Sequence, residues 1–133
     1  MGRAIAAVVV AFLLWTALWL GFTAGAQAAF PDVVDPEQPL TRTGALLAYV
    51  GYSVVISALA GYVCAAVRGP APMRTVWTFA IIQLVVGVGF EMSYWEMTPV
   101  WYHLLFLTLV VPATVAGGGI RARKSDPLTV AAQ

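Results

Sequence analysis

The residues of this chain that are best suited to chemistry lie in one short segment, from Glu91 to His103. If the chain turns back on itself near Met97, Glu91 and His103 are equally far from the turn. They would then face each other at the same depth on two neighbouring helices. In an apolar environment a carboxylate and an imidazole are costly unless they are paired, so we predict that these two side chains are in contact.

This pair is compatible with three kinds of chemistry and with a structural role. Glu91 and His103 could pass a proton, because imidazole titrates near neutral pH. Met92, Met97 and His103 could bind Cu(I), which prefers thioether and imidazole ligands. His103 could also be the ligand of a haem or chlorin. We predict no cofactor and favour the structural role, a hydrogen bond that joins the two helices, because no HxxxH, HExxH or CxxC motif accompanies the single His.

Other functional classes have no signature in the sequence. There is no Gly-x-Ser-x-Gly turn and no phosphate-binding loop, so we expect a protein that is not an enzyme. The net charge of +1 and the lack of a basic stripe argue against nucleic-acid binding. Cys64 is the only cysteine, which excludes an intrachain disulfide bond.

Four apolar segments must position the Glu91/His103 pair. Hydrophobic residues make up 61% of the 133-residue chain and charged residues only 10%, which is far below the share typical of soluble domains. The segments cover residues 4–24, 44–67, 75–95 and 100–118, and each is about long enough to cross a bilayer. The sequence therefore predicts an all-α integral membrane protein. Residues 1–124 would form one antiparallel bundle of four transmembrane helices, and residues 125–133 a short cytoplasmic tail.

The charges predict how the bundle is oriented. Six of the seven Lys and Arg residues lie at the N-terminus, between the second and third segments, or at the C-terminal end. Five of the six acidic residues lie in or beside the other two gaps. By the positive-inside rule both termini are cytoplasmic. The residues expected to anchor in the lipid headgroups are Arg68, Arg74, Arg121, Arg123 and Lys124.

The first segment has two interpretations. Arg3, a long apolar run and Ala26-Gln27-Ala28 are typical of a secretory signal peptide and its cleavage site. The length of the run and the bulky Trp15 and Trp19 favour an uncleaved membrane anchor instead. Cleavage would leave three spans.

Small and polar residues predict how the helices pack. A helix-packing seam is expected from Ser53, Ser57, Gly61 and Ala65, which recur at every fourth position, together with Gln83. Gln83 lies near the membrane centre and should face a neighbouring helix or a partner subunit rather than lipid, because an unpaired amide is costly there. We expect Gly117-Gly118-Gly119 to end the fourth helix.

Several short motifs are shared with a known class of proteins. They are Phe30-Pro31, Ala60-Gly61-Tyr62-Val63-Cys64, Thr98-Pro99-Val100-Trp101-Tyr102, and Pro112 followed by Gly117-Gly118. In these features the chain resembles small four-span bacterial inner-membrane proteins of unknown function. The resemblance implies architecture and no activity. The excess of Arg over Lys, six to one, also suggests a bacterium and hence the inner membrane.

These observations lead to one main expectation and two alternatives. We expect an accessory or assembly subunit of a larger membrane complex, whose partners are the lipid bilayer and other membrane proteins or a second copy of itself. The first alternative is a homo-oligomeric transporter or channel for a small ion or solute, lined by Ser53, Ser57, Gln83 and the Glu91/His103 pair. The second is a redox or pigment-binding module that uses His103.

Overall fold

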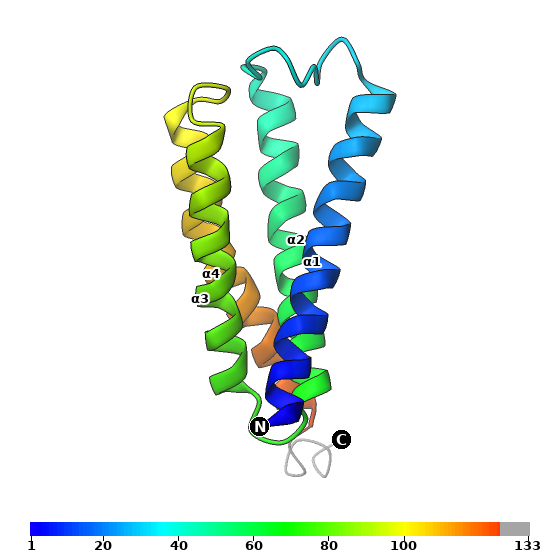
Figure 1. Ribbon diagram of the computed structural model, residues 1–133, viewed down its shortest axis with the longest axis vertical. Helices are drawn as coiled ribbons and strands as arrows, with labels where there is room; N and C mark the ends of the chain where they lie inside the picture. Colours follow the sequence, from blue (N-terminus) through cyan, green and yellow to red (C-terminus); the bar gives the residue numbers. More distant parts are fainter. Residues whose placement is uncertain (126–133) are drawn as a thin grey trace.

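Apolar sequence is continuous enough in this chain to form four long helices. The computed structural model describes residues 1–125, and all four helices are long and apolar enough to cross a membrane (Figure 1). The chain is therefore a multi-pass, all-helical membrane protein. Its helices are α1 (Gly2–Ala29), α2 (Thr43–Arg68), α3 (Met73–Ser93) and α4 (Val100–Lys124).

The breaks between the helices follow from residues that cannot continue a helix. The connection from 30 to 42 contains Pro31, Pro36 and Pro39. In the connection from 69 to 72, Gly69 adopts a φ of 77°, which favours glycine. The third connection, 94 to 99, ends at Pro99, which precedes the first turn of α4. The short connections make neighbouring helices antiparallel.

One predicted boundary is wrong. The helix expected to end at Gly117-Gly118-Gly119 continues to Lys124. Gly117 and Gly118 are buried inside the bundle, where they are points of close contact between helices. Small residues serve that purpose in membrane helices, and a continuous hydrogen-bond ladder offsets their low helix propensity in an environment without water. The third helix ends at Ser93, slightly before its predicted limit, and the predicted tail lies outside the described residues except for Ser125.

The closest helix pair is α2 with α4, which are not neighbours in the sequence. A Cβ atom placed on Gly61 would collide with the backbone of Thr114, and one placed on Gly117 would collide with the backbone of Ala58. The two backbones are therefore in direct contact. A further Cβ on Gly118 would collide with the side chain of Val76 on α3, so three helices meet at this level.

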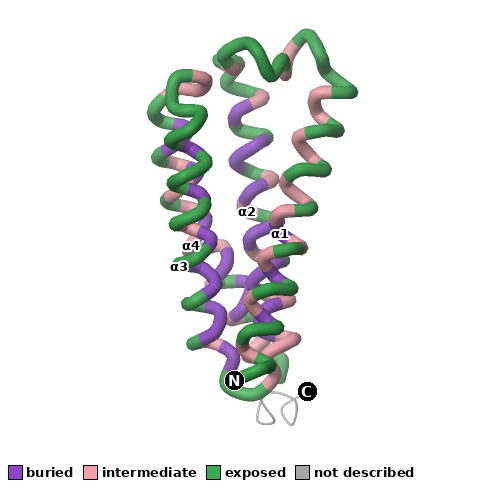
Figure 2. Tube along the Cα trace, in the orientation of Figure 1, coloured by how far each residue is buried: buried purple, intermediate pink, exposed green. Residues whose placement is uncertain are grey.

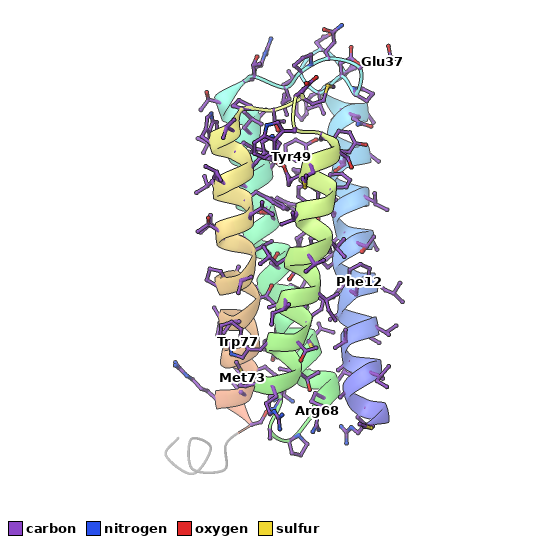
Figure 3. The ribbon with its side chains drawn as sticks, turned by 60° about the vertical axis from the view of Figure 1, so that its left-hand side comes forward. Phe12, Glu37, Tyr49, Arg68, Met73 and Trp77 are labelled. Carbon is purple, nitrogen blue, oxygen red and sulfur yellow. The ribbon has the colours of Figure 1, made fainter. Side chains whose placement is uncertain are left out.

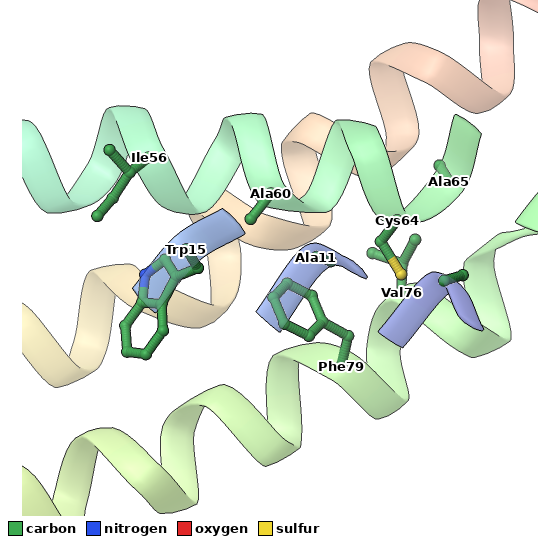
Figure 4. Packing of buried hydrophobic residues seen from close by; sticks show 9 residues of the cluster. Ala11, Trp15, Ile56, Ala60, Cys64, Ala65, Val76 and Phe79 are labelled. Atoms are coloured by element: carbon green, nitrogen blue, oxygen red, sulfur yellow. The ribbon is translucent and has the colours of Figure 1, made fainter. Parts of the chain in front are cut away.

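Helix α1 packs on this core mainly through its first half. Its only buried residues are Ala7, Ala11 and Trp15. Figure 4 shows Ala11 and Trp15 between α2 and α3, close to residues such as Ala60 and Phe79. Beyond Trp15, α1 leans away from the rest of the bundle, and Figure 2 shows that part as half-buried or exposed.

The two ends of the bundle differ in charge. We call the end that holds Met1, the 69–72 connection and the last turn of α4 the basic end (Figure 1). The opposite end, with the 30–42 and 94–99 connections, is the acidic end. Five predicted headgroup anchors lie at the basic end, where Figure 3 shows Arg68: Arg68, Arg74, Arg121, Arg123 and Lys124. The acidic connections carry Asp32, Asp35, Glu37 and Glu96.

Candidate functional site

Glu91 and His103 are in contact at the acidic end, as the hairpin geometry predicts. Glu91 lies in the last turn of α3 and His103 in the first turn of α4. His103 Nδ1 lies against Glu91 Oε2, and the two residues are 0% and 3% exposed respectively. Each is the nearest ionisable partner of the other, which offsets the cost of burying them.

The other nitrogen of the imidazole is also occupied. His103 Nε2 lies 3.0 Å from Thr98 Oγ1 and 3.2 Å from the carbonyl oxygens of both Trp95 and Thr98. The imidazole also stacks on the indole of Trp95, with the ring centroids 4.5 Å apart and the planes 9° from parallel. The 94–99 turn therefore encloses one edge and one face of the ring.

These contacts limit the possible protonation states of the pair. A carbonyl oxygen only accepts hydrogen bonds, so Nε2 carries a hydrogen and donates it. The contact between Nδ1 and Glu91 then holds one more proton, either on the imidazole or on the carboxyl group. The pair is thus an imidazolium with a carboxylate, or an imidazole with a carboxylic acid, and in both forms its net charge is zero.

A metal ion or haem at His103 does not fit this arrangement. Both ring nitrogens are engaged, and one ring face is covered by Trp95. Met92 is 69% exposed whereas His103 is fully buried, so the structure does not bring these predicted Cu(I) ligands together. Met97 is half-buried and faces a pocket instead. Within residues 1–125 no group of three or more His, Cys, Asp or Glu side chains could hold a metal ion.

A pocket of about 230 Å³ is lined in part by Glu91, and we call it the pocket in front of Glu91. All four helices and both acidic connections contribute to its wall. Tyr49 and Tyr102 are buried beside it, and Figure 3 shows Tyr49 inside the bundle below the connection that carries Glu37. The backbone N–H of Leu40 donates to the Met97 carbonyl over 2.8 Å, which ties the two connections together at the mouth.

A second polar cluster lies at mid-height in the bundle, on three helices. Gln83 Nε2 donates to Ser57 Oγ over 3.1 Å. The Thr114 hydroxyl lies 2.6 Å from Gln83 Oε1 and 2.9 Å from the Val110 carbonyl. Ser57, Gln83 and Thr114 are all 0% exposed. We call these three residues the mid-bundle cluster, and Glu91, Thr98 and His103 the acidic-end cluster.

The structure places the residues of the predicted seam inside the bundle. Ser53, Ser57, Gly61 and Ala65 are all buried, and Gln83 reaches across to Ser57. Ser53 donates to the Val50 carbonyl of its own helix over 2.7 Å, so it takes no part in the cluster.

Sequence reasoning missed three contributors to the two clusters. Thr114 completes the mid-bundle cluster, and its position one turn before Gly117 and Gly118 on the same helix face was a usable signal. Trp95 and Thr98 enclose the imidazole through their backbone carbonyls, for which the sequence carries no signal, and through the Trp95 indole and the Thr98 hydroxyl.

No protein-family model, curated protein or solved structure matches this chain.

Proposed function

We propose that this protein is a non-enzymatic membrane subunit that assembles side by side with another membrane protein. The observation that carries this proposal is an open surface of small residues on α1. Gly21 and Gly25 are spaced four residues apart and are exposed. A Cβ atom at either position would meet no atom within 4 Å.

Small residues also bring helices together inside the chain, where a neighbouring helix occupies the space beside them. Gly61 and Gly117 bring the backbones of α2 and α4 into contact. Small residues spaced by four are a common means of association between membrane helices, because they allow close van der Waals packing. Gly21 and Gly25 offer a comparable surface without an occupant among residues 1–125.

A groove adjoins this surface between α1 and α2. It is about 570 Å³ in volume and lies near the acidic end. Gly25, Ala45 and Ala48 line it together with Phe22 and Tyr49. Small residues in the wall and aromatic rings at the sides suit the insertion of an apolar helix from a partner protein.

Substitution of these glycines tests the proposal. Gly21→Ile and Gly25→Ile should each abolish co-purification of the partner from native membranes in mild detergent, without loss of folded protein. Gly89→Ile on α3 is the matched control, because Gly89 is exposed and equally free of contacts. If the wild-type chain runs as a single monomer and co-purifies with no protein, the proposal fails.

We also propose that the chain lies in a bacterial inner membrane with its basic end in the cytoplasm. The support is the concentration of Arg and Lys at that end and of acidic residues at the other. Single cysteines at Glu37 and Lys124 would report the orientation, because the native Cys64 is buried and should react little. A membrane-impermeant maleimide should label Glu37→Cys in spheroplasts and leave Lys124→Cys unlabelled, and the reverse pattern would contradict the orientation.

The transporter alternative has less support. Its path requires Ser57 and Gln83 to face a channel, but these side chains bond to each other and are fully buried. Closed contacts of this kind are typical of helix packing.

A further inference from the structure

The pocket in front of Glu91 has an unusual lining for a cavity in a membrane protein. Asp35 and Glu91 are among its lining residues, and no Lys, Arg or His residue is. Arg42, at the end of the 30–42 connection, is the exception among residues 1–125, and the other Lys and Arg residues lie at the opposite end of the bundle. Because the Glu91/His103 pair is neutral as a whole, Asp35 is the one charged side chain in the wall, and its charge favours a cation over an anion.

Aromatic rings make up much of the rest of the wall. The pocket is lined by five of them, four from the four helices and one from the 94–99 connection: Trp19, Tyr49, Phe90, Tyr102 and Tyr94. Trp19 and Tyr49 meet edge to face, with their centroids 5.9 Å apart. The face of an aromatic ring attracts a cation through its quadrupole, and cages of such rings bind quaternary ammonium groups.

One polar atom at the pocket lacks a partner. Thr23 lines the pocket from α1, and its hydroxyl oxygen is buried without a hydrogen bond. A buried hydroxyl without a partner costs free energy, which a bound molecule with a polar group would recover. This observation is independent of the charge and of the aromatic wall.

A bare metal ion suits this lining poorly. Calcium and magnesium require six or more oxygen ligands. Here the two acidic residues, one in the 30–42 connection and one in α3, are accompanied mainly by aromatic and aliphatic residues. An alkylated ammonium group is bulky and weakly hydrated, so it is matched better by aromatic faces with a nearby carboxylate.

We propose that this pocket binds a small organic cation with an alkylated ammonium group. The aromatic rings hold the alkyl groups, Asp35 supplies the negative charge, and Glu91 adds a polar group to the wall. The ligand is either a free molecule or the headgroup of a lipid, because the pocket lies at the end of the membrane-spanning helices. The site uses Trp19 and Thr23 of α1 rather than Gly21 and Gly25, and it shares Tyr49 with the groove proposed for assembly.

Calorimetric titration of the purified protein tests the proposal. Tetramethylammonium chloride is the probe, the protein is kept in a maltoside detergent that carries no charge, and sodium chloride at the same concentration is the salt control. Saturable binding of tetramethylammonium and none of sodium is expected. Equal heats for the two salts, or no saturation, would overturn the proposal.

A comparison of choline with an uncharged analogue shows whether the positive charge of the ligand contributes to binding. Choline should bind, and its uncharged isostere 3,3-dimethylbutanol should bind at least about tenfold more weakly, since one cation–π contact with charge attraction amounts to roughly that factor. Equal binding of the two molecules would show an apolar site and contradict the proposal.

Two variants locate the site. Asp35→Asn should weaken binding several-fold, and Asp32→Asn is its control, because Asp32 is an exposed carboxylate of the same connection that does not line this pocket. Trp19→Leu should weaken binding by about tenfold while the protein stays folded, as judged by its melting curve. Unchanged binding in both Asp35→Asn and Trp19→Leu would overturn the location.

Nanodiscs distinguish the two sources of the ligand. In phosphatidylglycerol discs tetramethylammonium should bind as it does in detergent. If a lipid headgroup is the ligand, phosphatidylcholine discs should abolish that binding by competition. If the ligand is a free molecule, binding should be the same in both discs.

Discussion

The mid-bundle cluster buries three polar side chains and the acidic-end cluster buries two, Glu91 and His103, beside the half-buried Thr98, and the two clusters differ in what they leave open. In the mid-bundle cluster each polar atom of Ser57, Gln83 and Thr114 has a partner within the cluster or on the backbone. None of the three groups changes its charge near neutral pH. The backbones of α2 and α4 are in direct contact near this level, α3 packs against them, and all three side chains are 0% exposed, so the cluster is closed.

The acidic-end cluster is closed on one side only. His103 is enclosed by the 94–99 turn, but Glu91 also forms part of the wall of a pocket. The pair holds a proton that can lie on either partner without a change in net charge. We infer that buried polar side chains have two roles in this chain. Those at mid-height join the helices, and Glu91 at the acidic end forms part of the wall of the proposed ligand pocket.

The largest expected effect tests how tightly the mid-bundle region is packed. Gly117→Leu should prevent folding, because its Cβ would collide with the backbone of Ala58, which cannot move aside as a side chain can. We expect a loss of more than about 3 kcal/mol in the free energy of unfolding, above the usual cost of overpacking. Size-exclusion chromatography and thermal melting in detergent provide the measurement.

The matched control lies two positions further along α4. A Cβ on Gly119 would meet no atom within 4 Å, so Gly119→Leu should fold like the wild type. If Gly117→Leu and Gly119→Leu behave alike, the direct backbone contact between α2 and α4 is wrong.

The second prediction concerns the pair at the acidic end. His103→Leu and Glu91→Leu should each lower the free energy of unfolding by about 3 kcal/mol, because each leaves the other group buried without its partner. The double variant should lose less than the sum of the two, since it removes both polar groups together. Unfolding in mixed micelles gives all three values.

Glu96→Leu is the control for this cycle. Glu96 is an exposed carboxylate of the same turn, and its removal should leave stability nearly unchanged. Strict additivity of Glu91→Leu and His103→Leu would show that the two groups do not interact.

The third prediction compares one threonine from each cluster. Thr114→Val should cost about 1–2 kcal/mol, because it leaves the carbonyl oxygen of Gln83 without its donor. Thr98→Val should cost less, because His103 Nε2 keeps two carbonyl acceptors. Melting curves of the two variants in one detergent are sufficient, and an equal loss would contradict the difference between the clusters.

The sequence predicted the four helices well, because the apolar segments are long and their breaks contain proline or glycine. It did not predict that α2 and α4 form the closest pair. Gly61 and Gly117 are packed against backbone, whereas Gly21 and Gly89 are open, yet all four lie in apolar helices of similar composition. Only the three-dimensional arrangement distinguishes a glycine that packs against another helix of the chain from one whose Cβ position is open.

The candidate site was predicted in part. The equal spacing of Glu91 and His103 from Met97 predicted their contact, because a hairpin brings equivalent positions together. The pocket was not predicted, since its wall combines α1 and the 30–42 connection with the distant 94–99 turn. Contacts between such distant segments depend on the tilt of the helices, which hydropathy does not predict.

The smallest expected effect comes from removing the whole mid-bundle cluster. In the triple variant Ser57→Ala, Gln83→Met and Thr114→Val, no polar side chain remains to be satisfied at that level. We expect stability within about 1 kcal/mol of the wild type, since hydrogen bonds between membrane helices average about 0.6 kcal/mol each. The triple variant should thus be at least as stable as Thr114→Val alone, which leaves a buried carbonyl unpaired.

The triple variant should also bind tetramethylammonium as the wild type does, because the cluster does not line the pocket in front of Glu91. A triple variant that folds but no longer binds would mean that the two clusters are coupled through α3, and the division of the bundle into a packing region and a ligand region would fail.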